Sequence, residues 1–328
     1  MRHTILAAGL TLIAGGALAQ TPVLTVYTYD SFIPDWGPGP AIEAAFEETC
    51  GCDLQFVGAG DGAALLSRIR LEGARSEADV VLGLDTNLTA AAVETGLFAP
   101  HGVASDGLTM PVEWTDPLFL PFDWGYFAFV HDVALDEVPR SFEELAASDI
   151  SIIIQDPRSS TPGLGLLMWV QLAYGERAGE IWEALSDNIV TVTPGWSEAY
   201  GLFLEGEADM VLSYTTSPAY HLIAEDDPTK AAAAFDEGHY MQVEVAGILE
   251  GTDQPELARD FVEFMLTEAF QTVIPTTNWM YPAALSPEAL PDGFDTLVQP
   301  EIPLIFDAQE AAAVRDEALA TWQSALSR

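Results

Sequence analysis

The sequence predicts an α/β protein of two lobes with a ligand cleft between them. Residues 23–98 alternate strand and helix patterns, an order typical of a parallel sheet with helices on its faces. A second run of the same kind follows residue 121, and long strands near 122–131 and 239–249 bracket it. The chain therefore crosses twice between two α/β units. Clefts between such units, facing the carboxyl ends of strands, are common ligand sites.

The individual elements follow from the period of the apolar residues. In the first unit, strands are predicted at 23–29, 53–57 and 78–85, with helices at 39–48, 63–73 and 88–98. In the second unit, strands are predicted at 123–132, 150–157, 189–193 and 209–214. Its helices are predicted at 140–148 (capped by Ser141), 161–174, 179–187, 197–206 and 217–225. A strand at 239–249, a helix at 254–267 opened by Pro255 and a last helix at 308–326 complete the chain.

Residues 1–19 have the pattern of a secretory signal peptide. Arg2 is positively charged, Thr4–Gly16 is an apolar run too short to span a bilayer, and Ala17–Ala19 is an A-x-A cleavage signal. We expect cleavage after Ala19. No cysteine follows that position, which argues against a lipid anchor. The mature protein is expected to be soluble and, in a bacterium, periplasmic.

The chain is strongly acidic, with 51 Asp and Glu against 11 Lys and Arg and a formal net charge of −40. Such a surface repels nucleic acid and anionic membranes, so neither is an expected partner. Adaptation to a salty habitat explains this charge at least as well as a function does. No substrate is inferred from it.

Two cysteines, Cys50 and Cys52, flank Gly51. An oxidising compartment allows a disulfide between them, and this bridge needs a turn at Gly51 because an extended C-x-C segment is near the upper limit of reach. A metal site would need further ligands, and none lie nearby in the sequence. Redox activity is the least favoured interpretation.

Three patterns typical of enzymes do not support a catalytic function here. Residues 58–63, GAGDGA, fit a dinucleotide-binding fingerprint, but an exported protein rarely meets free dinucleotide. Residues 195–199, GWSEA, lack the second glycine of the hydrolase elbow, and Ser197 is better explained as a helix N-cap. No HExxH or HxxEH motif is present, so no metal site and no catalytic residue are predicted.

Three predicted helix starts carry hydroxyl or glycine residues directly after a strand. They are Asp61-Gly62, Ser160-Thr161 before Pro162, and Thr215, Thr216 and Ser217 before Pro218. Free N–H groups at the positive ends of helices suit an anion such as a phosphate ester. Ordinary capping explains any one of them equally well. A role in ligand binding is favoured because the three helix starts come from both lobes.

Several aromatic residues lie at positions where a core role is not expected. Most aromatic side chains are expected in the core, but a subset sits in polar turns or at element ends: Tyr29, Trp36, Trp196, Tyr220 and Trp279. Such positions suit stacking on a flat heterocycle or a cation, at about 0.5–2 kcal/mol per contact.

These segments resemble the periplasmic thiamine-binding proteins of bacterial ABC importers. The similarity runs across nearly the whole mature chain and includes LTVYTYDSF, EGARSEADVVLGLDTNL, QDPRSSTPGLGLL, GWSEAYGLFL, VLSYTTSPAYH and NWMYP. The paired Cys50 and Cys52 are shared as well. The resemblance implies a type II periplasmic-binding-protein fold, with lobe one at 20–124 plus 242–282 and lobe two at 125–241 plus 283–328.

The resemblance also implies a ligand and its contacts. Thiamine, thiamine monophosphate or thiamine diphosphate would lie in the cleft, and the partners would be an inner-membrane ABC permease and its ATPase. The implied contacts are Asp61, Gly62, Ser160, Thr161, Trp196, Tyr214, Thr215, Thr216 and Ser217, with Tyr29, Trp36, Tyr220 and Trp279 as aromatic walls. No cofactor and no catalysis are expected, and the chain is expected to be a monomer. The alternatives are a binder of another organic cation or phosphate ester, and a secreted ester hydrolase using Ser197.

Overall fold

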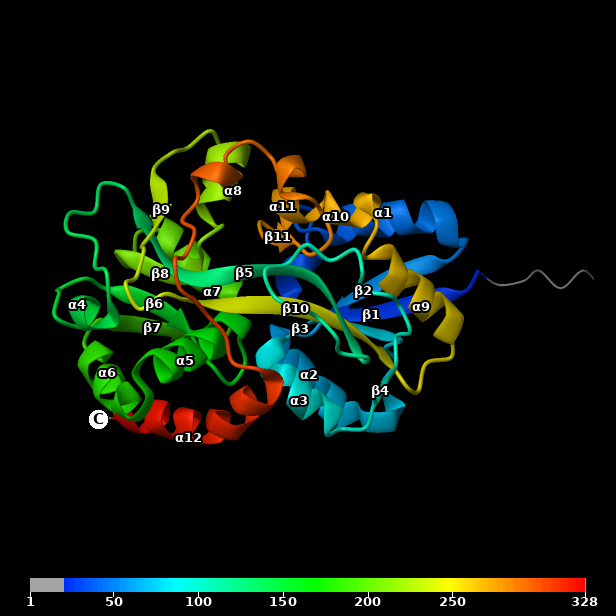
Figure 1. Cartoon of the computed structure of the whole chain (residues 1–328), viewed down its shortest axis with the longest axis horizontal. Helices are drawn as coiled ribbons and strands as arrows, with labels where there is room; N and C mark the ends of the chain where they lie inside the picture. The colour runs from blue at the N-terminus through cyan, green and yellow to red at the C-terminus, as the bar shows by residue number, and fades with distance from the viewer. Residues whose placement is uncertain (1–20, 328) are drawn as a thin grey trace, which may run out of the picture.

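A computed structural model describes residues 21–327, and it shows two α/β lobes side by side along the long axis of the molecule (Figure 1). Strands β5 (Phe119–Asp132) and β10 (His239–Leu249) run through the centre of both lobes. The predicted two-lobed architecture is confirmed. The signal peptide predicted at 1–19 lies outside the described residues.

The first lobe is a sheet in the order β2-β1-β3-β10-β5. Its parallel strands are β1 (Val23–Thr28), β2 (Asp53–Gly58) and β3 (Val80–Asp85), and β10 runs antiparallel to β3. Every residue of β3 is buried, because helices cover both faces of the sheet. The helices of this lobe are α1 (Gly39–Cys50), α2 (Gly62–Glu72), α3 (Thr86–Val93), α9 (Pro255–Phe264), α10 (Glu268–Gln271) and α11 (Ile274–Thr277).

The second lobe continues the sheet in the order β5-β8-β6-β7. Strands β6 (Ile152–Gln155), β7 (Ile189–Thr193) and β8 (Met210–Tyr214) are parallel, and β8 runs antiparallel to β5. The helices are α4 (Phe142–Ala146), α5 (Thr161–Tyr174), α6 (Ala178–Leu185), α7 (Trp196–Leu204) and α8 (Pro218–Ala224). Helix α5 is buried throughout residues 161–170 because its sequence is apolar on all sides.

Strand β5 changes its partner where it passes from one lobe to the other. Residues 119–126 pair with β10, and residues 127–131 pair with β8. The predicted lobe boundaries lie close to this change but stay a prediction. Short strands that the sequence did not indicate complete the sheet: β4 (Phe98–Ala99), β9 (Lys230–Ala232), β11 (Tyr281–Pro282) and β12 (Pro303–Leu304).

Helix α12 (Ala308–Leu326) packs against both lobes. It contacts α3 of the first lobe and α5 and α6 of the second, and it runs along one side of the molecule (Figure 1). Its N-terminus is fixed by a capping box, in which Asp307 accepts from the backbone of Glu310 and the Glu310 side chain accepts from the backbone of Asp307. The helix therefore fastens the two lobes together on that side.

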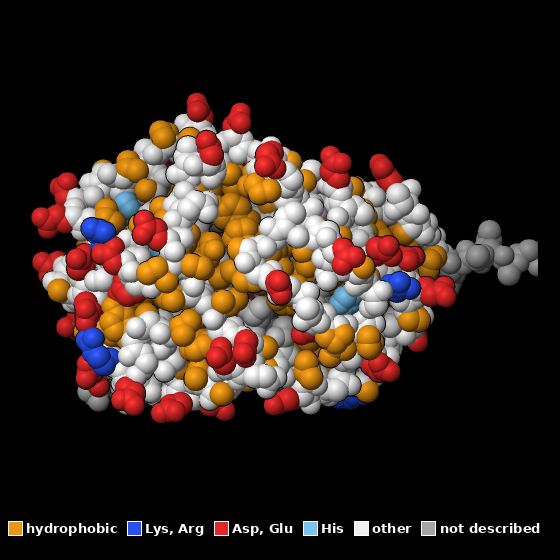
Figure 2. Space-filling view, viewed as in Figure 1, with side chains coloured by type: hydrophobic (Ala, Val, Ile, Leu, Met, Phe, Trp, Pro, Cys, Tyr) orange, Lys and Arg blue, Asp and Glu red, His pale blue; other side chains and the backbone are white. Residues whose placement is uncertain are grey.

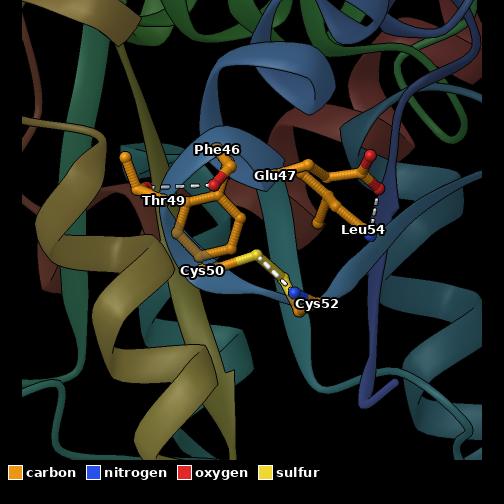
Figure 3. The surroundings of a disulfide bond; sticks show 6 residues. All are labelled: Phe46, Glu47, Thr49, Cys50, Cys52 and Leu54. Atoms are coloured by element: carbon orange, nitrogen blue, oxygen red, sulfur yellow. Dashed lines mark hydrogen bonds between the residues drawn. A yellow bond between two sulfur atoms is a disulfide. The ribbon is translucent and has the colours of Figure 1, made fainter. Parts of the chain in front are cut away.

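Cys50 and Cys52 form a disulfide at the end of α1 (Figure 3). Gly51 between them has φ 63°, so the turn needed for the bridge is present and is provided by a residue that tolerates this conformation. Beside the bridge, the backbone N–H of Leu54 donates to Glu47 (2.9 Å; Figure 3). Both contacts connect α1 to β2.

Acidic side chains are scattered over the visible face of the molecule rather than gathered in one patch (Figure 2). This distribution indicates that the charge belongs to that surface as a whole and not to one site. Among residues 21–327, no helix combines the length and apolar character needed to cross a membrane.

Candidate ligand-binding site

A cavity of about 520 Å³ lies between the lobes. Ligand sites of this volume enclose a molecule of drug size. Nine of the residues predicted from the sequence line it: Tyr29, Trp36, Asp61, Thr161, Trp196, Tyr214, Ser217, Tyr220 and Trp279. Ser197 also lines it. The structure thus brings together residues from both lobes that follow the ends of five strands, β1, β2, β6, β7 and β8.

Aromatic rings line this cavity in two contacting pairs. Trp196 stacks on Tyr200 with ring centres 5.0 Å apart, and Tyr220 of α8 meets Trp279 edge to face at 5.5 Å. Trp279 has φ 57°, which a bulky residue rarely adopts without a reason. Trp36 is 56% exposed, so its ring is free to cover a ligand at the mouth.

The polar end of the cavity is closed by hydrogen bonds that cross between the lobes. Asp61 Oδ2 accepts from Ser160 Oγ (2.7 Å) and from the backbone N–H of Trp196 (3.1 Å). Close by, the Gly62 N–H donates to Thr161 Oγ1 (3.0 Å), and the Ala64 N–H donates to the Ser159 carbonyl (3.1 Å). We call these four bonds the interlobe latch. Burial raises the pKa of Asp61 to about 6.

The latch changes the prediction made for the helix starts. Three helix N-termini do converge, but they belong to α2, α5 and α7 rather than to α2, α5 and α8. Two of their backbone donors are already used, because the Trp196 N–H donates to Asp61 and the Gly62 N–H donates to Thr161 Oγ1. Ser197 is not the N-cap of α7, since the helix begins at Trp196 and Gly195 is its N-cap.

The hydroxyls at the start of α8 are largely turned into the protein. Ser217 Oγ bonds Ser213 Oγ (2.7 Å), and Thr216 Oγ1 donates to Met280 Sδ (3.8 Å). Thr215 is fully buried. Four predicted contacts are therefore absent from the cavity lining: Gly62, Ser160, Thr215 and Thr216. They support the residues that do line it.

Sequence reasoning missed a cluster of acidic and amide side chains that flanks the cavity. Glu244 of β10 lines the cavity and accepts from Tyr29 Oη (3.2 Å). Asp123 of β5 lies opposite it in the strand register and accepts from Asn278 Nδ2 (2.6 Å). The signal was present in the sequence, because each carboxylate interrupts a strand that is apolar on both faces. Buried carboxylates beside a cleft are candidates for a functional role.

A second group not foreseen consists of His221, Glu225 and Asp227, whose potential ligand atoms lie within 4.8 Å of one another. Both ring nitrogens of His221 already have partners, Glu225 Oε2 at 2.8 Å and Tyr200 Oη at 3.0 Å. The group is therefore explained as a hydrogen-bond chain behind the aromatic wall.

Two lobes joined by crossing strands and closed over a cavity define a solute-binding protein of the type II fold. The profile of the bacterial extracellular solute-binding proteins matches residues 36–272, and the chain belongs to this family. Within it, the chain is 55% identical to the thiamine-binding periplasmic protein of Salmonella typhimurium, over 97% of this chain and 98% of that protein. It is 48% identical to the protein of the same name from Brucella melitensis, over 93% and 92%. The resemblance inferred from the sequence is confirmed.

Solved structures agree with this assignment. A periplasmic thiamin-binding protein superposes with a TM-score of 0.92 at 54% identity, covering 97% of this chain and all of that one. The iron-bound HitA of Pseudomonas aeruginosa superposes with a TM-score of 0.75 at 20% identity, over 93% of this chain and 99% of that one. The second similarity supports the fold alone, and the predicted type II fold is confirmed.

Proposed function

We propose that this protein captures thiamine in the periplasm and delivers it to an inner-membrane ABC permease and its ATPase. The observation that carries the proposal is a cavity lined by aromatic rings, with a carboxylate, Glu244, also in its lining. The names of the relatives that match nearly the whole chain support the same ligand. Cleavage of the precursor after Ala19 and a monomeric mature protein belong to this proposal.

The cavity offers a partner for each part of thiamine. The aminopyrimidine and the thiazolium are flat rings, which stack on Trp and Tyr faces. The thiazolium is a cation, and its charge is favoured by the aromatic faces and by Glu244. The hydroxyethyl arm suits the polar end at Thr161 and Asp61.

Thiamine monophosphate and diphosphate are included as ligands in the proposal. Their phosphate is drawn to the converging N-termini of α2, α5 and α7. The Asp61 carboxylate repels it unless a proton is taken up. The phosphate esters are therefore expected to bind best below the pKa of Asp61.

A thermal-shift titration of residues 20–328 tests the proposal, with thiamine and its two phosphates as ligands and choline, spermidine and fructose 6-phosphate as controls. A ligand that binds only the folded state adds about 2.7 kcal/mol of stability at a hundred times its dissociation constant. We expect a rise in Tm with the thiamine compounds that is smaller in Trp279→Ala. No rise with ligand-free protein at millimolar thiamine would refute the proposal, and a rise with a control alone would favour another cation or phosphate ester.

The hydrolase alternative is tested by the same preparation. No hydrogen bond joins Ser197 to a histidine among residues 21–327. Thiamine monophosphate is therefore expected to be recovered unchanged after incubation with the protein. Phosphate release that is lost in Ser197→Ala would establish the alternative.

A further inference from the structure

The two central strands place a pair of carboxyl groups face to face beside the cavity. Glu244 of β10 and Asp123 of β5 are directly opposite each other in the antiparallel register. Side chains in such positions point to the same face of the sheet with their Cβ atoms about 4.5–5.5 Å apart. Glu244 is 6% exposed and Asp123 is fully buried. Two carboxylates so close and so poorly hydrated cannot both be ionised without a compensating positive charge.

The hydrogen bonds around the pair leave one acceptor without a donor. Tyr29 Oη donates to Glu244 Oε2, and Asn278 Nδ2 donates to Asp123 Oδ2. The other oxygen, Asp123 Oδ1, is buried and has no partner among the described residues. A proton held between the two carboxyl groups supplies the missing donor.

The groups that face the pair from neighbouring elements do not supply positive charge. They are Tyr29 after β1, Asp85 at the end of β3 and Tyr214 at the end of β8. No Lys, Arg or His in residues 21–327 forms an ion pair with either carboxylate. Burial is the main cause that raises the pKa of both Glu244 and Asp123, which agrees with a proton held between them in the empty site.

We propose that a cationic ligand entering this cavity expels the proton shared by Glu244 and Asp123, so that capture of thiamine is coupled to proton release. The thiazolium charge takes over the compensation that the proton gives in the empty site, and the proton passes to water or buffer. One positive charge enters and one leaves, so the net charge of the buried cluster stays constant. The inference rests on the proposed function for the identity of the cation.

The coupling distinguishes a cation from a neutral molecule of similar shape. A neutral molecule leaves the shared proton in place, so its binding is expected to release no proton and not to change with pH over this range. For thiamine, the dissociation constant is expected to fall by up to about tenfold for each unit by which the pH rises, over the range in which the empty site holds its proton.

Isothermal titration calorimetry tests the inference directly. Thiamine is titrated into the mature protein at about pH 7.5 in phosphate, HEPES and Tris, whose ionisation enthalpies differ, and the slope of the binding enthalpy against them counts the protons exchanged. Thiamine is used because a phosphate ester itself exchanges protons near neutral pH. This pH lies above the pKa of about 6 of Asp61, so closure of the latch adds no proton. We expect release of about one proton per thiamine bound.

Variants assign the proton to the pair. The double variant Glu244→Gln/Asp123→Asn removes both carboxyl groups that can hold the shared proton, so the slope is expected to fall to zero, with weaker binding. If the double variant does not fold, Asp123→Asn alone is expected to reduce the slope, because the proton is then no longer shared between two carboxyl groups. Asp253→Asn, which removes an exposed carboxylate from the loop before α9, is the control and is expected to keep both the affinity and the slope.

The outcomes separate the inference from the proposed function. Tight thiamine binding with no buffer dependence in the wild type would overturn the coupling and leave the function intact. An unchanged slope in the double variant would also overturn it. No thiamine binding by folded, ligand-free wild type would instead refute the proposed function.

Discussion

Replacing Asp61 by alanine is expected to weaken thiamine binding by about ten- to a hundredfold. The variant removes two of the four latch bonds, those from Ser160 Oγ and the Trp196 N–H at 2.7 and 3.1 Å. Bonds to a charged acceptor contribute about 1.5–3 kcal/mol each, and these two join the lobes only in the closed state. Burying the carboxylate offsets part of this gain. A net loss of about 1.4–2.7 kcal/mol remains, which gives the stated change in affinity.

The assay is calorimetric titration with thiamine, combined with small-angle scattering at saturating ligand to detect opening of the lobes. Asp253→Ala is the matched control, because it removes one exposed carboxylate from the loop before α9. Circular dichroism establishes that both variants fold. An affinity of Asp61→Ala within about twofold of the wild type, with unchanged scattering, would show that the latch does not stabilise the closed state.

Two further predictions concern stability. Replacing both Cys50 and Cys52 by serine is expected to lower the free energy of unfolding in urea by only about 1.6 kcal/mol, because the bridge joins residues two apart and closes a very small loop. A loss above about 3 kcal/mol would contradict this entropic origin. His239 accepts from the Phe235 N–H at Nε2 and bonds the Phe127 carbonyl through Nδ1, so its buried ring is neutral, and burial lowers its pKa. The unfolded chain takes up the proton first, so stability falls as pH drops below about 6.5. His239→Gln should lose this part of the profile, and parallel curves for variant and wild type would refute it.

Much of the fold could be predicted because its elements are long and strongly periodic. The bounds expected for α5, β7, β10 and α12 are those of the structure. The helix expected at 88–98 is present as α3, but its predicted end was wrong, since α3 ends at Val93 and β4 begins at Phe98. Strands of two or three residues, such as β11 and β12, are defined by their partners β5 and β10 and leave no local pattern.

Only part of the candidate site could be predicted from the sequence. Aromatic residues in polar turns, such as Trp36 and Trp279, could be found because their local sequence does not require an aromatic core residue. The role of Asp61 could not, because its partners lie 99 and 135 positions away and meet it only when the lobes close. Glu244 was missed for a different reason. A charge inside an apolar strand was visible, but β10 was considered only as a crossing strand.

The position of helix α12 limits how early during synthesis the protein can fold. Its contacts with α3, α5 and α6 connect residues 308–326 to segments made much earlier in synthesis. The first lobe also needs β10, which comes after the whole second unit. Neither lobe can therefore complete its packing until the ribosome has released almost the entire polypeptide. This delay suits the export that the signal peptide expected at residues 1–19 implies, because a chain that has not yet folded can be threaded through a membrane channel.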